Sequence, residues 1–367
     1  MNSTQYTPTE TETKDGIINR PQGKPASVAG GKDTHMKAIV LHKYGSPDVL
    51  NLEEVQKPIP KDNEVLVKVH AASVNAGDWH LMRADPFLIR LMFGLLKPKH
   101  SILGSDVAGR VEAVGRNVTH FQPGDEVFGD VAGNGFGAFA EYVSAPEDTF
   151  VSKPSSLTFE EAAAVPLAAV TALQGLRDHG QIQAGQKVLI NGASGGVGTY
   201  AVQIAKSYGA EVTGVCSTSK VEMVRSIGAD HVIDYTQEDF TQNGQQYDLI
   251  LAVGGNRGLA EYKRALAPKG IYVMVGGSSA AQMFQAMLLG PLHSRNGGKQ
   301  MGSMMAQPNQ KDLATVKELV DAGKVVPVVD KQYPLSEVPD AIRYLEAGRA
   351  QGKIVINLGN KESANVD

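Results

Sequence analysis

The sequence has little cysteine, no excess of positive charge and no long apolar run. Cys216 is the only cysteine among 367 residues, which excludes an internal disulfide framework and any zinc site built from several thiolates. The 35 lysines and arginines are outnumbered by 39 aspartates and glutamates, and a formal net charge of −4 does not favour general nucleic-acid binding. The most apolar stretches, Ala162–Val170 and Met283–Leu292, are too short to span a bilayer, and each contains a proline. We therefore expect no membrane span.

Glycine, in contrast, is abundant. Its 40 residues are about 11% of the chain, against roughly 7% in an average protein. Such an excess indicates tight turns and close backbone approaches, which nucleotide-binding sites require. Apolar residues make up 42% of the chain, enough for a core of normal size, and the length allows about two domains.

The beginning of the chain is polar. Residues 1–35 are rich in threonine, glycine and proline, and they lack the apolar centre of a secretory signal. Four acidic residues argue against a transit peptide: Glu10, Glu12, Asp15 and Asp33. We predict a disordered extension at 1–35 and a flexible tail at 361–367. A single cysteine fits a reducing compartment, and we expect a cytoplasmic location.

Two different patterns follow Met36. Short strands separated by proline and glycine predict a mostly β domain, with strands at Lys37–Leu41, Glu64–Ala71, Asp106–Val114, Glu126–Phe128 and Phe139–Ser144. Helical spacing appears at Glu160–Arg177. From Lys187 onward strands alternate with helices, which predicts an α/β fold with a parallel, doubly wound sheet.

The elements of this second part can be placed individually. Strands are expected at Lys187–Asn191, Glu211–Cys216, His231–Asp234, Asp248–Val253, Gly270–Val275 and Gln300–Met305. Helices are expected up to Tyr208, at Lys220–Ile227 and at Asn256–Ala267. The segment 280–306 is otherwise ambiguous. Two helices, Asp312–Ala322 and Val338–Glu346, and a strand at Lys353–Leu358 then return the chain to the character of its first part.

The most informative run is the glycine-rich turn after the strand at Lys187–Asn191. A helix N-terminus offers unpaired N–H groups and partial positive charge to a pyrophosphate. Without side chains at Gly195 and Gly196 a phosphate can approach the backbone, and Gly198 lets the helix pack closely on the strand. Because strand, turn and helix occur together and further βα units follow, the turn indicates a dinucleotide site.

The end of the second strand indicates which dinucleotide binds. An acidic residue there would bond the ribose 2′-hydroxyl of NAD and repel a 2′-phosphate. The chain instead has Ser217, Thr218 and Lys220, with no acid before Glu222. Hydroxyls and a cation can hold a phosphate, so we predict NADPH rather than NADH. The alternative for Lys220 is a solvated lysine at a helix start.

Residues 185–206 resemble the signature of the quinone oxidoreductase (ζ-crystallin) branch of the medium-chain dehydrogenase/reductase superfamily. The match includes Ala193-Ser194-Gly195-Gly196-Val197-Gly198, Gln203 and Lys206. The similarity extends over residues 36–358, through Val74-Asn75-Ala76-Gly77-Asp78, Leu103-Gly104-Ser105-Asp106, Pro123-Gly124-Asp125-Glu126-Val127, Gly228-Ala229-Asp230 and Gly352-Lys353.

The resemblance implies a fold and a domain order. A GroES-like, mostly β catalytic domain would comprise 36–158 and 307–360, and a Rossmann NADP-binding domain would comprise 159–306, with the active cleft at their junction. The implied cofactor contacts are Gly192, Ser194, Gly195, Gly196, Val197, Ser217, Thr218, Lys220, Tyr235, Gly276 and Lys353. A homodimer is also implied, with contact at Gln300–Met305.

The resemblance further implies an activity. Members of this branch move hydride from NADPH to quinones or to the C=C bond of α,β-unsaturated carbonyls, so an apolar carbonyl or quinone substrate is expected. Zinc enzymes of the superfamily use cysteines and a Gly-His-Glu run, but this chain has Asn75 and Gly104-Ser105-Asp106 at the matching places. With no soft thiolates there, we expect no metal site.

Candidate catalytic residues lie in the run Asn75–His80. Asn75 can bond the substrate oxygen or the nicotinamide ribose, and Asp78 can orient a neighbour. His80 stands where related quinone oxidoreductases carry a tyrosine, and an imidazole can supply a proton near neutral pH. The alternatives are that His80 is a structural hydrogen-bonding group and that water delivers the proton.

Two further features remain open at this stage. Trp79 and the apolar residues up to Leu96 either wall a substrate pocket or belong to the core, and Gly133–Gly137 is either a cleft loop or a simple hairpin connection. The alternative functions are an NAD(P)-dependent alcohol or aldehyde dehydrogenase and, in another class, a non-catalytic NADPH-binding protein of the crystallin kind.

Overall fold

The computed structural model describes residues 34–255, 257–276 and 298–359. Disorder was expected at residues 1–35 and 361–367. Residues 1–33 and 361–367 lie outside the described residues, whereas Thr34 and His35 are described. The apolar stretch Met283–Leu292 also lies outside the described residues. None of the described helices is both long and apolar enough to cross a bilayer.

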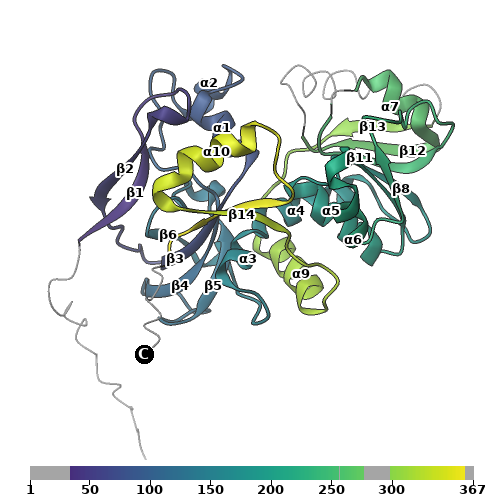
Figure 1. Ribbon diagram of the computed structural model, residues 1–367. Helices are drawn as coiled ribbons and strands as arrows, with labels where there is room; N and C mark the ends of the chain where they lie inside the picture. Colours follow the sequence, from purple (N-terminus) through teal and green to yellow (C-terminus); the bar gives the residue numbers. More distant parts are fainter. Residues whose placement is uncertain (1–33, 256, 277–297, 360–367) are drawn as a thin grey trace, which may run out of the picture. The chain divides into compact units, whose positions relative to one another are not determined.

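The first part of the chain forms a mixed sheet (Figure 1). Its described strands run in the order β14-β15-β3-β4-β5-β7, and β6 pairs with β3. The strands are β3 (Glu64–Val74), β4 (Asp106–Val114), β5 (Glu126–Asp130), β6 (Tyr142–Pro146), β7 (Phe150–Ser152), β14 (Val329–Pro334) and β15 (Lys353–Asn357). The yellow C-terminal strands complete a sheet begun by purple and blue ones, because β15 pairs antiparallel with β3. The last strands of the chain therefore lie in the same sheet as β3 and β4.

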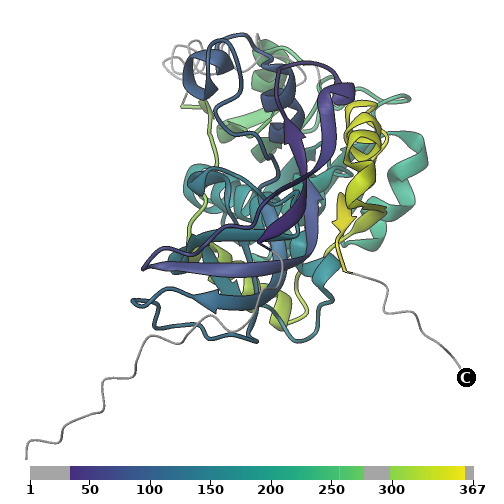
Figure 2. The same cartoon turned by 90° about the vertical axis from the view of Figure 1, so that its left-hand side faces the viewer.

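Two more strands and several helices surround this sheet. Strands β1 (His35–Leu41) and β2 (Leu50–Gln56) pair with each other and are drawn in purple facing the viewer in Figure 2. Helix α1 (Ala76–Arg83) follows β3, and α2 (Ile89–Phe93) follows α1. Near the end of the chain, α10 (Val338–Glu346) follows the short turn η6 (Leu335–Glu337). Met82, Phe139 and Phe150 are fully buried in the core between these elements.

The second part is a parallel sheet in the order β10-β9-β8-β11-β12-β13. Its strands are β8 (Lys187–Asn191), β9 (Glu211–Cys216), β10 (His231–Asp234), β11 (Tyr247–Ala252), β12 (Leu266–Met274) and β13 (Gln300–Ser303). The chain runs from β8 to one edge and then from β11 to the other. The order therefore reverses between β8 and β11, and in such sheets ligands bind at the carboxyl ends of the strands beside that reversal.

Helices connect these strands and join the two sheets. Helices α5 (Gly196–Ser207), α6 (Val221–Ser226) and α7 (Leu259–Ala265) are the crossovers, and α9 (Gln310–Asp321) packs on α4 (Pro166–Gln174). The helical spacing at Glu160–Arg177 corresponds to three consecutive helical segments: α3 (Phe159–Ala163), α4 and a π-helix (Gly175–His179). The break falls before Pro166, which starts α4 because proline lacks the N–H that a helix interior needs.

Candidate active site

The glycine turn between β8 and α5 has no room for side chains at two of its positions. Gly192 adopts a φ of +89°, a conformation that glycine tolerates best. A Cβ on Gly198 would lie 2.0 Å from the carbonyl oxygen of Gly192, so any other residue would push α5 away from the strand. Gly195 is the N-cap of α5, which begins at Gly196. The turn thus presents a bare helix N-terminus at the sheet's reversal point.

The loop between α10 and β15 lies against this turn. The N–H of Gly352 donates to the carbonyl of Ser194 at 2.9 Å, and Gly352 forms an isolated parallel bridge with Gly195. Lys220 reaches the same loop, donating to the carbonyls of Ala350 at 2.9 Å and Gly348 at 3.3 Å. The C-terminal loop and the nucleotide turn therefore form one wall.

A groove of about 930 Å³ runs along this wall. Seven of the residues expected to bind cofactor line it: Gly192, Ser194, Gly195, Gly196, Ser217, Lys220 and Tyr235. Its lining also includes the cations Arg257 and Arg349 beside Lys220, and among the described residues no aspartate or glutamate lines it. A groove with three cations, no carboxylate and a bare helix N-terminus fits a dinucleotide with several phosphates.

The other four expected cofactor residues lie differently. Val197 packs partly buried against the core, and the hydroxyl of Thr218 donates to Asp234 at 2.6 Å. Gly276 sits at the end of β12, where an added Cβ would be 2.7 Å from the carbonyl oxygen of Val253. Lys353 does not line the groove, but its side chain passes over Gly196, where an added Cβ would be 3.0 Å from its Cδ.

Lys353 ends in a buried polar cluster. Its ammonium donates to the side-chain oxygen of Asn75 and to Asp106 Oδ2, the latter at 3.1 Å. Asn75 Nδ2 donates to Asp106 Oδ2 at 2.9 Å and to Ser105 Oγ at 3.2 Å. Lys353 is 3% exposed and Asp106 is 0% exposed. A charge pair this deeply buried persists only when both groups are hydrogen-bonded.

Asp106 is the hub of this cluster, and sequence reasoning noted it only as part of a motif. Besides Asn75 and Lys353, it accepts the Ser73 hydroxyl at 2.7 Å and the N–H of Leu167 at 2.8 Å. Both carboxylate oxygens are therefore paired. The feature of the sequence that could have indicated this role is a carboxylate at the start of an apolar strand, β4.

Asp78 holds the first turn of α1 in place. Its carboxylate accepts the N–H of Asn75 at 2.7 Å and the N–H of Gly104 at 3.2 Å. Burial and the nearby charge of Asp106 raise the pKa of Asp78 to about 7, although both N–H bonds and Lys353 oppose that shift. Asp78 thus fixes the backbone that presents Asn75, and its role in catalysis stays a prediction.

His80 makes its contacts elsewhere. Its Nδ1 donates to the carbonyl oxygen of Asp85 at 2.6 Å, because a carbonyl can only accept, and its ring stacks on Trp79 with centroids 3.6 Å apart. The structure brings Asn75, Asp78 and Lys353 together, but no described contact joins His80 to them. A catalytic role for His80 stays a prediction.

The apolar residues after Trp79 do not enclose a cavity of useful size. Met82 belongs to the core, whereas Leu91, Met92 and Leu96 are exposed. The space beside Leu81 and Phe93 amounts to only about 10 Å³. Met82 therefore fits the core-packing alternative.

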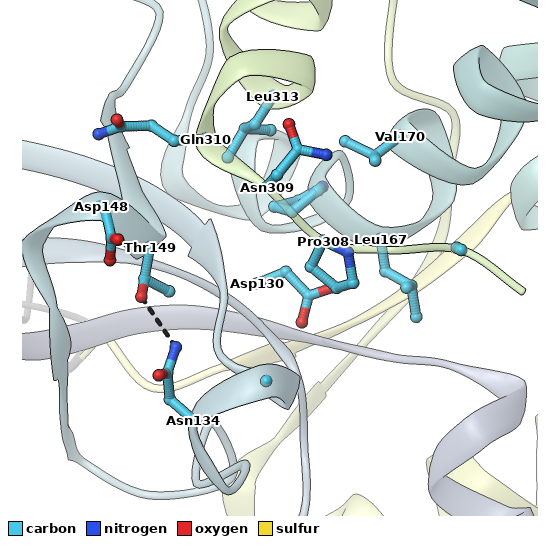
Figure 3. Close-up of a pocket in the computed structure, with 13 residues that line it drawn as sticks. Asp130, Asn134, Asp148, Thr149, Leu167, Val170, Pro308, Asn309, Gln310 and Leu313 are labelled. Carbon is cyan, nitrogen blue, oxygen red and sulfur yellow. Dashed lines mark hydrogen bonds between the residues drawn. The ribbon is translucent and has the colours of Figure 1, made fainter. Parts of the chain in front are cut away.

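A larger cavity of about 330 Å³ is lined by Asp130 and Leu167 (Figure 3). Asp130 lines it and pairs with Asp106 in register across β4 and β5, and Leu167, which bonds Asp106, lines it too. Its walls comprise Asp130, Gly133, Asn134, Asp148, Thr149, Pro166, Leu167, Val170, Ala306, Pro308, Asn309, Gln310 and Leu313. Gly133 and Asn134 place part of the glycine-rich loop at a cleft.

Sequence reasoning missed Asp130. It ends β5 directly after Val127-Phe128-Gly129, and an acid that follows this apolar run was the available signal. Its side chain is 8% exposed, and its Oδ1 accepts the N–H of Ala132 at 2.9 Å. Burial, and next the charge of Asp106, raise the pKa of Asp130 to about 7.

The donors of the cluster do not suit zinc. Zinc in proteins prefers thiolate, imidazole and carboxylate ligands, whereas the groups around Asp106 are an amide, hydroxyls and an ammonium. The Lys353 ammonium, 3.1 Å from Asp106, would repel a dication there. Within the described ranges, no group of three or more histidine, cysteine or acidic side chains is arranged to hold a metal.

Comparisons with known proteins place the chain in a family. Residues 61–155 match the model described as alcohol dehydrogenase GroES-like domain, and residues 227–356 match the model described as zinc-binding dehydrogenase. The mitochondrial NAD(P)H oxidoreductase RTN4IP1 of Mus musculus is 34% identical over 93% of this chain and 94% of its own length. The chain belongs to the medium-chain dehydrogenase/reductase superfamily.

Two more relatives narrow the place within this superfamily. The chloroplastic NADPH-dependent alkenal/one oxidoreductase of Arabidopsis thaliana is 35% identical over 88% of this chain and 79% of its own length. The solved quinone oxidoreductase of Coxiella burnetii superimposes with a TM-score of 0.80 at 30% identity, covering 89% of this chain and all of that one. The resemblance inferred from the sequence and the fold class, a GroES-like domain with a Rossmann-like parallel sheet, are confirmed.

Membership of the medium-chain dehydrogenase/reductase superfamily makes the protein an oxidoreductase that uses a nicotinamide cofactor on a small-molecule substrate. The expected cytoplasmic location is wrong by the same comparison, because the mouse relative is named as mitochondrial and the Arabidopsis relative as chloroplastic. A single cysteine is compatible with any reducing compartment, so it could not distinguish the cytosol from the interior of an organelle.

Proposed function

We propose that the protein is an NADPH-dependent, zinc-free reductase of quinones or of the C=C bond of α,β-unsaturated carbonyls. The observation that carries this proposal is the groove whose described lining contains three cations and no carboxylate. Its lining residue Gly352 directly precedes Lys353 of the buried cluster. The printed names of the relatives, a quinone oxidoreductase and an NADPH-dependent alkenal/one oxidoreductase, support the same substrates.

In this proposal, different residues of the groove bind different parts of the dinucleotide. Backbone N–H groups of the turn at Ser194–Gly196 receive the pyrophosphate, while Ser217 and Lys220 receive the 2′-phosphate and disfavour NADH. Tyr235, which is 56% exposed, offers its ring to the adenosine end. Burial lowers the pKa of Lys220, but its two carbonyl partners favour the charged ammonium that a phosphate needs.

The cluster supplies the chemistry of the acceptor end. When bound, the dihydronicotinamide supplies a hydride to the substrate. Negative charge then develops on the substrate oxygen, and the Lys353 ammonium with the Asn75 amide is the positively charged group that can stabilise it. Asp106 and Asp78 hold these two side chains in place through the bonds described above.

Substrate and cofactor assays test this function directly. NADPH oxidation should be seen with 9,10-phenanthrenequinone or 2-alkenals, and the Michaelis constant for NADPH should lie well below that for NADH. Turnover only of simple alcohols with NADP would support the alcohol dehydrogenase alternative. NADPH binding with no turnover of any acceptor would support a non-catalytic binding protein.

A homodimer is proposed through β13. This strand lies at the end of the described strand order. A strand at the edge of a sheet can pair with the same strand of a second copy. Sedimentation equilibrium of the intact chain should give twice the monomer mass, and Gly302→Pro in β13 should shift it toward one.

A further inference from the structure

The carboxyl group of Asp130 is an anomaly among the buried acids. Asp106 and Asp78 have both oxygens bonded, but Asp130 Oδ2 is buried and finds no hydrogen-bond partner among the described residues. An unpaired buried carboxylate oxygen costs free energy, and a protonated carboxyl instead has an O–H to donate. The group therefore lacks an acceptor, and it lies on the wall of the 330 Å³ cavity (Figure 3).

The charges that face Asp130 favour its protonated form. Asp106 on β4 and Asp78 on α1 repel a charge on Asp130, and Lys353 on β15 attracts it but is held directly by Asp106. The exposed Asp148, in the short turn Glu147–Thr149, lines the same cavity. With a pKa of about 7, much of Asp130 carries a proton at neutral pH.

The rest of the cavity wall offers a ligand little else. No lysine, arginine or histidine in the described part of the chain lines it. The amide of Asn134 is bonded to Thr149 at 2.9 Å, that of Gln310 to the Phe150 carbonyl at 2.8 Å, and Asn309 is bonded to Asp312. Prolines, Leu167, Val170 and Leu313 supply apolar surface. Such a cavity suits an uncharged, mainly apolar molecule with one oxygen acceptor, and its acids disfavour carboxylates.

We propose that this cavity is the acceptor-substrate site and that Asp130 is a catalytic residue, the acid that protonates the substrate oxygen. The inference rests on the proposed reductase function. For an enone, hydride adds to the β-carbon and the C=C electron pair moves to form an enolate. The O–H bond of Asp130 breaks as a new O–H bond forms on the substrate oxygen. The resulting enol tautomerises to the saturated ketone, and water returns a proton to the Asp130 carboxylate.

Variants of Asp130 test the proposal, with 2-cyclohexen-1-one as the enone. Asp130→Asn keeps the size and a hydrogen-bond donor but has no acidic proton, so kcat should fall roughly 100-fold with KM within about threefold. Asp130→Leu should also raise KM. Asp62→Asn is the control: it removes one charge from an exposed ion pair with Arg116 that does not line the cavity, and it should leave both constants within about twofold.

The pH profile provides a readout that a structural role would not give. Wild-type kcat should fall as the pH rises through about 7, because the protonated form of Asp130 is the active one, and the residual activity of Asp130→Asn should not show this limb. Asp78→Asn should still show this fall in kcat as the pH rises. The infrared band of protonated carboxyl groups, followed from pH 5 to 9, reports the same titration without turnover. It should be weaker in Asp130→Asn than in the wild type, and the band that remains in this variant is assigned to Asp78, whose pKa is also raised to about 7, if it is missing in the double variant with Asp78→Asn.

Other outcomes would overturn the inference. Wild-type kcat and pH profile in Asp130→Asn would remove Asp130 from the reaction while leaving the reductase function intact. If Asp130→Asn does not fold, Leu167→Trp fills the cavity without altering the acid, and an unchanged KM for the enone would contradict the substrate site. Absence of NADPH oxidation by the wild type with every quinone and enone would overturn the proposed function as well.

Discussion

Replacing Lys353 by methionine should destabilise the protein by about 3 kcal/mol. Its ammonium is 3% exposed and lies 3.1 Å from the fully buried Asp106, and removing one partner of a buried pair costs roughly 3–5 kcal/mol. We expect the lower end of this range because the hydroxyl of Ser73, the amide of Asn75 and the N–H of Leu167 still donate to Asp106 in the variant.

Urea unfolding followed by circular dichroism measures this loss. Lys61→Met is the matched control, since Lys61 forms an exposed ion pair with Glu64 and should cost no more than about 1 kcal/mol. Combining Lys353→Met with Asp106→Asn should cost about 2 kcal/mol less than the sum of the single changes, because the second change removes the stranded charge. A loss for Lys353→Met as small as that for Lys61→Met would refute the buried pair as a source of stability.

Three further predictions concern the cofactor groove and α1. Lys220→Ala should raise the Michaelis constant for NADPH about tenfold or more and leave that for NADH within about twofold; equal changes would refute 2′-phosphate recognition. His80→Phe should keep kcat within about twofold, since its Nδ1 is bonded to Asp85, and a larger loss would assign it the proton transfer considered from the sequence. Gly198→Ala should weaken NADPH binding, measured by fluorescence titration, because its Cβ would clash with the Gly192 carbonyl 2.0 Å away; unchanged binding would contradict the close packing.

The parts of the fold that obey local rules could be predicted from the sequence. Strands β8, β9 and β10 have the expected bounds because apolar runs alternate with glycine turns there, and α10 matches because its apolar residues follow the helical period. Strand β2 and strand β14 were missed. Their residues are mostly half-buried or exposed, so they carry no apolar run, and only pairing with β1 and β15 makes them strands.

The candidate site likewise has one part that the sequence predicted and one part that it did not. The nucleotide turn is continuous in sequence, and its chemistry follows from its glycines. The cluster around Asp106 instead joins β3, β4, α4 and β15, with Lys353 247 residues away from Asp106 along the chain. Nothing local to Asp130 indicates that it ends beside Asp106, because their pairing depends on the register of β4 and β5. Sequence motifs therefore identified the cofactor site better than the substrate side.

The charges of this site explain how it can work without a metal. The Lys353 ammonium interacts with three buried acids, Asp78, Asp106 and Asp130. Among these three acids it is bonded directly only to Asp106. Asp106 therefore has a compensating charge, whereas burial raises the pKa of both Asp78 and Asp130 to about 7. Bonds from two backbone N–H groups favour the charged form of Asp78, but Asp130 has one such bond and a vacant oxygen. The proton is accordingly best retained on Asp130, so that the cluster holds a cation for the developing oxyanion and an acid to neutralise it.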